Sequence, residues 1–151
     1  MRVLVDTSVW SLSLRRPNQG RRPEPLELRR LISAHLVEVI GPIRQELLSG
    51  IRNPSQFERV ETHLSAFPDA PLLTEDYVTA AKFYNLCRSK GVQGSNTDFL
   101  ICAVAVRHDF AVFTTDGDFP LFAKHLPVVL HEIKIAAEPS PARNRRSRVE
   151  T

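Results

Sequence analysis

The sequence predicts an α/β fold in which a central parallel β-sheet is covered by helices on both faces. Short, almost wholly apolar runs that are typical of buried strands alternate with longer segments of helical periodicity. Helices inserted between strands favour parallel pairing, because a parallel crossover needs a dozen or more residues. A length of 151 residues fits one compact domain, and 42% hydrophobic with 25% charged residues is ordinary for a globular protein.

The first half of the chain is predicted to supply two strands and four helices. The three later helices are marked by Pro25, Pro42 and Pro54, since proline suits a first turn whose N–H groups lack partners. In chain order we expect a strand over residues 3–5, helices over 8–14 and 23–35, a strand over 37–40, and helices over 41–50 and 53–67. A polar loop over 15–22 separates the first two helices.

The second half continues the alternation. After a turn over 68–73, Thr74 caps a helix that runs to Ser89 and stops at Gly91, and Ser95 begins a helix that ends near Asp109. A strand over 111–115, a helix over 118–125 and a strand over 128–130 complete the predicted domain, which spans residues 1–135. The last segment, 136–151, holds two prolines, four arginines and few apolar residues, which predicts a disordered Arg-rich tail.

The composition argues against several classes of protein. No apolar run has the length of a membrane span, and the N-terminus is charged too early for a signal peptide. Cys87 and Cys102 form no CxxC pair, so we expect buried core thiols and a reducing, cytoplasmic location. The five histidines show no zinc-ligand spacing. The net charge of +3 comes from residues 139–151, outside which basic and acidic residues number 16 each.

Acidic residues stand where a metal site of a parallel sheet would form. Asp6 follows the strand over 3–5, and Asp116 follows the strand over 111–115. Sites in open parallel sheets form at the carboxyl ends of strands, so these two carboxylates are predicted to lie close together. Glu46 and Asp98 lie in helices that can aim at the same point. Oxygen ligands of this kind suit Mg²⁺ or Mn²⁺.

Each acid also has an ordinary structural explanation. Asp6 can cap the following helix, and Asp98 lies near a helix start, where acids are favoured by the dipole. Glu46 taken alone is best explained as a solvated helix residue, and Asp116 with Asp118 as a plain turn. Only the joint arrangement argues for a metal site.

Four sequence blocks, taken in order, resemble the PIN-domain ribonucleases, specifically the VapC-type toxins of bacterial toxin–antitoxin pairs. The blocks are Val5-Asp6-Thr7-Ser8-Val9-Trp10, Arg44-Gln45-Glu46-Leu47-Leu48-Ser49-Gly50, Asp98-Phe99-Leu100-Ile101-Cys102-Ala103 and Thr114-Thr115-Asp116-Gly117-Asp118-Phe119. Their order and spacing cover nearly all of residues 1–130, and the resemblance stops before the tail. Cys102 departs from the alanine that the family often has.

The resemblance implies a metal-dependent endoribonuclease toxin, with RNA as substrate, a cognate antitoxin as inhibitor and a homodimer as the assembly. It implies a catalytic set of Asp6, Glu46, Asp98 and Asp116. The metal ligands would be three of these acids, Asp6, Asp98 and Asp116, with Asp118 as an auxiliary. The hydroxyls of Thr7 and Thr115 would support the cluster.

The chemistry follows from the ion. Mg²⁺ or Mn²⁺ can lower the pKa of a bound water, orient a phosphodiester and neutralise the leaving oxygen. Two carboxylates ~5 Å apart repel by about 3 kcal/mol at an effective dielectric of ~20. We therefore expect either ion to raise the melting temperature, and Asp98→Asn to weaken that response. The sequence leaves open whether one ion or two are bound.

Other functions are less well supported. A phosphotransfer receiver would need an acidic pair at the first strand and a late lysine, and a phosphatase commonly has a second Asp where Ser8 stands. A catalytically silent RNA- or protein-binding module stays as the alternative. Six arginines between Arg15 and Arg30 predict either an RNA-binding rim or a solvated face. The apolar helix faces over 26–36 and 57–67 would bury a second subunit, an antitoxin or simply the core.

Overall fold

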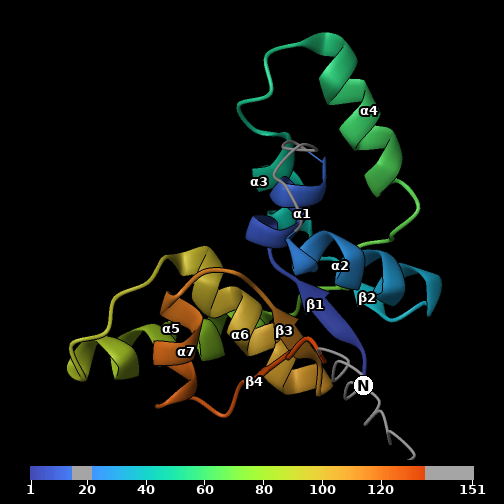
Figure 1. Ribbon diagram of the computed structural model, residues 1–151. Coiled ribbons are helices and arrows are strands. Elements are labelled where there is room, and N and C mark those ends of the chain that lie inside the picture. The colour runs from blue at the N-terminus through green and yellow to red at the C-terminus, as the bar shows by residue number, and fades with distance from the viewer. Residues whose placement is uncertain (15–21, 135–151) are drawn as a thin grey trace, which may run out of the picture.

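The computed structural model describes residues 1–14 and 22–134, and within them the chain forms four strands and seven helices (Figure 1). In chain order these are β1 (Val3–Val5), α1 (Thr7–Leu14), α2 (Pro23–Ser33), β2 (Val37–Glu38), α3 (Gly41–Leu48), α4 (Pro54–Leu64), α5 (Thr74–Ser89), α6 (Asn96–His108), β3 (Ala111–Phe113), α7 (Asp118–Ala123) and β4 (Val129–Leu130). The predicted Arg-rich tail lies outside the described residues, as do Arg15, Arg16 and Arg21.

The four strands form one parallel sheet, as the sequence predicted, and their order is β2-β1-β3-β4. Val3 pairs with Ala111 and Val5 with Phe113, so β1 and β3 end side by side. The N–H of Asp6 donates to the carbonyl of Phe113 at 2.8 Å, which extends this pairing by one residue. The two central strands therefore deliver their following residues to the same edge of the sheet.

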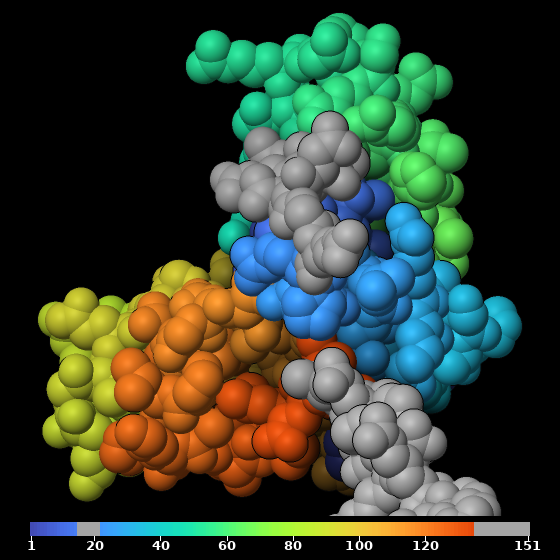
Figure 2. Space-filling model, viewed as in Figure 1, coloured from blue at the N-terminus to red at the C-terminus, as the bar shows by residue number. Residues whose placement is uncertain are grey.

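Helices lie on both sides of the sheet. In the view of Figure 1, α5, α6 and α7 lie to the left of the central strands, and α1, α2 and α3 lie above and to the right. Helix α4 rises from this second group, and Figure 2 shows its surface in green at the top of the molecule. The core between the layers is apolar and fully buried, and it includes Leu4, Val5, Ile43, Ile101, Val104 and Val112.

Several elements end earlier than the sequence predicted. Helix α2 stops at Ser33, because His35 adopts a left-handed conformation with φ of 55°. Helix α4 stops at Leu64 instead of continuing to 67. Strand β3 stops at Phe113, and Thr114 and Thr115 belong to the turn that follows. The turn predicted over 68–73 makes a single parallel bridge between Asp69 and Val39.

Ordinary packing explains most of the apolar helix faces that the sequence singled out. Leu28 and Leu31 of α2 and Val60 and Leu64 of α4 are buried in the core. Only Leu26 and Phe57 remain as large exposed hydrophobic side chains on these two faces.

Both cysteines are free and buried, as expected for core thiols. Burial raises the pKa of the Cys102 thiol, so this side chain stays protonated under physiological conditions. Within the described part of the chain, no helix has the length and apolar character needed to cross a membrane.

Candidate active site

Asp6 is the best-anchored acid at the carboxyl edge of the sheet. It follows β1, and its side chain is only 6% exposed. One carboxylate oxygen, Oδ1, accepts the N–H of Thr7 at 2.8 Å. The other, Oδ2, accepts the Ser8 hydroxyl at 3.0 Å and the Thr114 hydroxyl at 2.8 Å. A carboxylate that accepts three hydrogen bonds is held in one orientation.

The same hydroxyls join the ends of the two central strands. The Thr115 N–H donates to Ser8 Oγ at 3.0 Å, and the Asp116 N–H donates to Thr114 Oγ1 at 3.0 Å. Ser8 Oγ and Thr114 Oγ1 lie 3.3 Å apart. This network fixes the turn after β3 against the start of α1, and with it the positions of Asp6 and Asp116.

The hydroxyls that bind Asp6 therefore belong to residues that the resemblance did not name. Ser8 and Thr114 supply the hydroxyl groups, whereas Thr7 and Thr115 contribute backbone N–H groups. The Thr7 hydroxyl is buried without a hydrogen-bond partner of standard geometry among the described residues, although it lies near enough to Glu46 to lower the pKa of that carboxyl. The sequence could have indicated these two hydroxyls, because Ser8 lies two positions after Asp6 and Thr114 lies two positions before Asp116.

Asp98 opens α6 and makes a capping box with Ser95. Its Oδ2 accepts the Ser95 N–H at 3.0 Å, and its own N–H donates to Ser95 Oγ at 3.1 Å. Burial raises the pKa of Asp98, the bonds from Ser95 oppose that rise, and the charges of Asp6 and Asp116 add to it. Asp98 is thus a helix cap and also a charge neighbour of two other acids.

Glu46 approaches the same point from α3. Burial raises the pKa of its carboxyl, and the charges of Asp6 and Asp98 raise it further. The helix itself is held by Arg44, whose guanidinium donates to the Leu64 carbonyl at 2.9 Å, to the Phe67 carbonyl and to Asp69. Arg44 thereby ties α3 to the end of α4 and fixes the helix that carries Glu46.

Asp116 and Asp118 form the turn that leads into α7. The Asp116 carboxylate accepts the Asp118 N–H at 2.9 Å, which is the ordinary turn geometry that the sequence allowed. Asp116 is also one of the charges that raise the pKa of Asp98, whereas Asp118 is exposed and influences neither Asp98 nor Glu46 in this way. The structure therefore brings Asp6, Glu46, Asp98 and Asp116 together, with Asp118 at the margin.

The donor set of this cluster suits a hard divalent cation. Its side chains offer only oxygen, and in the described part of the chain no Lys or Arg contributes to the shifted pKa values of Glu46 and Asp98. Residues 1–14 and 22–134 contain no group of three or more His, Cys, Asp or Glu side chains that is already arranged to hold a metal ion. The carboxylates are close enough to repel one another, so a cation would relieve that repulsion, with waters completing its shell.

Two of the described arginines of the predicted rim form ion pairs. Arg22 pairs with Glu24 at 3.0 Å, and Arg30 pairs with Glu27 at 2.5 Å. Glutamates of α2 thus compensate both charges, which favours the solvated-face interpretation for these two residues.

A parallel sheet with carboxylates gathered at the carboxyl ends of its two central strands defines an α/β protein with an acidic site. Residues 3–125 match the PIN domain, and the chain belongs to this family. The chain is 30% identical over 126 residues to VapC ribonuclease Mb1587 of Mycobacterium bovis, covering 81% of this chain and 92% of that protein.

Solved structures share the fold. FitAcB from Neisseria gonorrhoeae superposes with a TM-score of 0.68 at 23% identity, covering 86% of this chain and 96% of the other. VapBC2 from Rickettsia felis, solved with a DNA fragment from its promoter, gives a TM-score of 0.69 at 16% identity and covers 89% and 100%. At these identities the likeness concerns the fold alone.

Proposed function

We propose that this chain is a metal-dependent endoribonuclease, acting as a toxin that a cognate antitoxin inhibits in the cytoplasm. The observation that carries the proposal is the cluster of Asp6, Glu46, Asp98 and Asp116, whose mutual repulsion no basic side chain among residues 1–14 and 22–134 offsets. A bound Mg²⁺ or Mn²⁺ supplies a water of lowered pKa and a counter-charge for the phosphodiester.

We assign the acidic residues to two roles, binding the cation and accepting a proton. Asp6, Asp98 and Asp116 would hold the cation, and Asp118 would assist from the margin. Glu46 has a raised pKa, so it suits proton uptake from the attacking water. The hydrogen bonds to Asp6 keep its carboxylate oriented before substrate arrives.

The partners in this proposal rest on the relatives. The similar protein of Mycobacterium bovis is described as a ribonuclease, which supports RNA as substrate. The Rickettsia felis structure is a VapBC2 complex, which supports an antitoxin partner, and a homodimer is the assembly we expect. The family match over residues 3–125 supports a nuclease domain within 1–135, followed by the Arg-rich segment 136–151.

The decisive experiment is RNA cleavage by the purified chain with Mg²⁺, Mn²⁺ or EDTA, with new 5′ ends mapped by sequencing. Asp98→Asn keeps an acceptor for the Ser95 N–H but removes a charge of the cluster, so cleavage should fall by about 100-fold or more. The matched control is Asp109→Asn at the other end of α6. Asp109 is exposed, and its left-handed φ of 56° is one that asparagine tolerates.

The same variants separate the nuclease from the silent binding module. Millimolar Mg²⁺ or Mn²⁺ should raise the melting temperature of the parent chain and of Asp109→Asn, and raise it less in Asp98→Asn. Metal-dependent cleavage that persists in Asp98→Asn would contradict the assigned site. Absence of both cleavage and a metal-dependent melting shift in the parent would favour the binding module.

A further inference from the structure

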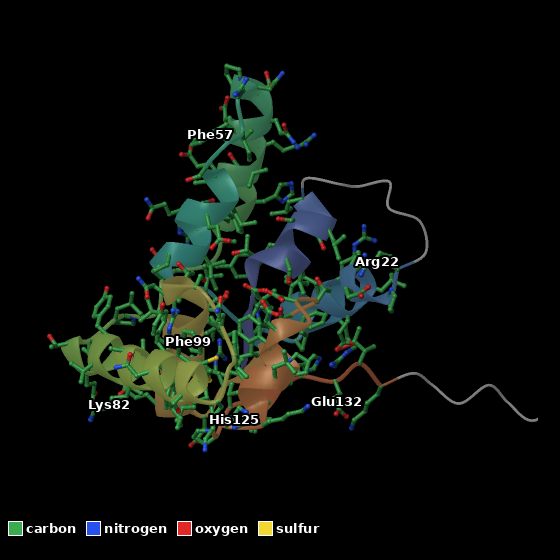
Figure 3. All side chains as sticks on the ribbon, turned by 90° about the vertical axis from the view of Figure 1, so that its left-hand side faces the viewer. Arg22, Phe57, Lys82, Phe99, His125 and Glu132 are labelled. Carbon is green, nitrogen blue, oxygen red and sulfur yellow. The ribbon has the colours of Figure 1, made fainter. Side chains whose placement is uncertain are left out.

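Two of the helices that start at the acidic edge, α6 and α7, each carry a buried phenylalanine directly after an acid. Phe99 follows Asp98 in α6, and Phe119 follows Asp118 in α7. Both rings contact Phe122, with centroids 4.7 Å from Phe99 and 5.2 Å from Phe119. Figure 3 labels Phe99, which lies with α6 in the interior of the molecule. One aromatic cluster thus joins the starts of the two helices.

Gly94 is packed against this cluster without room for a side chain. A Cβ at Gly94 would lie 2.5 Å from Phe122 Cζ and 3.0 Å from Phe99 Cε2. Phe122 is fully buried and Phe99 nearly so, and both rings pack in the hydrophobic core. The backbone at residue 94 has no left-handed φ, so close packing rather than backbone conformation is what calls for glycine here.

The contact is linked to Asp98 through Ser95. Ser95 directly follows Gly94, and its N–H donates to Asp98 Oδ2 at 3.0 Å. Its hydroxyl accepts the Asp98 N–H and so fixes the first turn of α6. A displacement of residue 94 away from Phe122 would therefore move the group that orients the Asp98 carboxylate.

We propose that Gly94 and Phe122 are positioning residues for the acidic site. Their close contact sets the spacing between the start of α6 and α7, and with it the position of Asp98 relative to Asp116. The inference rests on the proposed metal-dependent nuclease, whose carboxylates must meet around one point. Neither Gly94 nor Phe122 would touch the cation or the RNA.

The test adds a methyl group and then makes room for it. Gly94→Ala should push the start of α6 off Phe122, whereas Gly94→Ala with Phe122→Leu should restore much of the original spacing. Gly41→Ala is the matched control, because a Cβ there has its nearest neighbour at 3.9 Å, the Asp69 Oδ2 atom. Phe122→Leu alone loosens the same contact without overpacking it, so it keeps the test valid if Gly94→Ala does not fold.

Mn²⁺ binding without RNA is the main measurement, made by the electron paramagnetic resonance signal of free Mn²⁺. Disturbing groups that orient a metal ligand typically weakens affinity by about 10- to 100-fold, and we expect a loss of this size in Gly94→Ala. Single-turnover cleavage at saturating Mn²⁺ should fall by up to about 100-fold, as displacements near 1 Å do. Phe122→Leu alone should show a smaller loss of affinity, and the double variant should recover most of it.

The outcomes separate this inference from the proposed function. Unchanged Mn²⁺ affinity in both Gly94→Ala and Phe122→Leu would overturn the positioning role, even if both variants melt at a lower temperature. Loss of affinity that the double variant fails to recover would also overturn it, because the spacing would then not be the cause. If the parent neither binds Mn²⁺ nor cleaves RNA, the proposed function fails first.

Discussion

The two hydroxyl groups that donate hydrogen bonds to Asp6 link the ends of the central strands. Ser8 and Thr114 each donate to Oδ2, and each also accepts a backbone N–H from the turn after β3. A buried carboxylate needs such donors, since an unpaired charge in the interior is costly. The hydroxyls therefore give the buried Asp6 carboxylate hydrogen-bond partners and fix its orientation next to other acids.

Thr114→Val tests this function of the hydroxyl at nearly constant shape. It leaves Asp6 Oδ2 with one donor fewer and the Asp116 N–H without its acceptor, so the free energy of unfolding should fall by about 1–3 kcal/mol. Thr115→Val is the matched control, because Thr115 is exposed and bonds to Ser8 through its backbone. Urea denaturation of the two variants measures the difference. Equal losses, or a larger loss in Thr115→Val, would contradict the assignment.

The residues that the sequence singled out differ in how far they could be predicted. Asp6 and Asp116 follow strands that are adjacent in a parallel sheet, so their meeting follows from topology. Glu46 and Asp98 lie on helices whose tilt is set by packing that no local pattern shows. The resemblance implied the hydroxyls of Thr7 and Thr115, of which Thr7 lies close to Glu46. The hydroxyls of Ser8 and Thr114 were not predicted, because a one-residue shift at a strand end turns a side chain to the opposite direction.

Helices α5 and α6 are joined by an ion pair at the end of α6 that is distant from the acids. The Arg107 guanidinium donates to Asp76 at 2.6 and 2.8 Å and to the Pro71 carbonyl at 3.1 Å. Asp76 is only 1% exposed, and it also accepts the Leu73 N–H at 2.8 Å. The guanidinium beside Asp76 holds the pKa of that carboxyl below its usual value.

Arg107→Leu should destabilise the protein by about 3 kcal/mol at neutral pH, since it leaves a buried carboxylate without its partner. Because the folded-state pKa of Asp76 is lowered, its contribution is present above the ordinary carboxyl range near pH ~4 and is lost as pH falls through the folded value. The difference between parent and variant should therefore shrink in acid.

Urea denaturation at neutral pH and near pH ~3 measures this change. Arg88→Leu is the control, because Arg88 is exposed on α5 and only makes a long 3.4 Å contact with the Tyr84 hydroxyl. A difference between parent and Arg107→Leu that is the same at both pH values would show that the ion pair is not its source.

The sequence predicted the type and order of the helices and strands better than the residues at which they end. Proline and capping signals placed the starts of α2, α3, α4 and α6 within a residue or two. The predicted elements were too long where the chain leaves the helix or strand through a left-handed residue or a residue whose side chain accepts a backbone N–H. His35 is one example, and Thr114 after β3 is another. Such endings depend on tertiary partners that a local pattern does not contain.

The molecule as a whole combines carboxyls whose pKa values are shifted in opposite directions. Asp76 and Glu27 have lowered pKa values through Arg107 and Arg30, so they stabilise the fold above the ordinary carboxyl range. Glu46 and Asp98 have raised pKa values through burial and neighbouring acids. The second pair favours folding when protonated, and that contribution is lost as pH rises through the folded-state values.

A cation that binds the cluster must displace these protons, which links its effect to pH. We expect the rise in melting temperature caused by millimolar Mg²⁺ or Mn²⁺ to be small in the ordinary carboxyl range near pH ~4 and to grow as pH rises and Glu46 and Asp98 lose their protons. Thermal unfolding over this rise in pH, with metal or with EDTA, gives the increment at each pH. Glu46→Gln removes one of the two titrating groups, so its increment should be smaller and change less steeply. Asp109→Asn should reproduce the parent curve. An increment that is the same at every pH, or that falls as pH rises, would contradict carboxylate binding by this cluster.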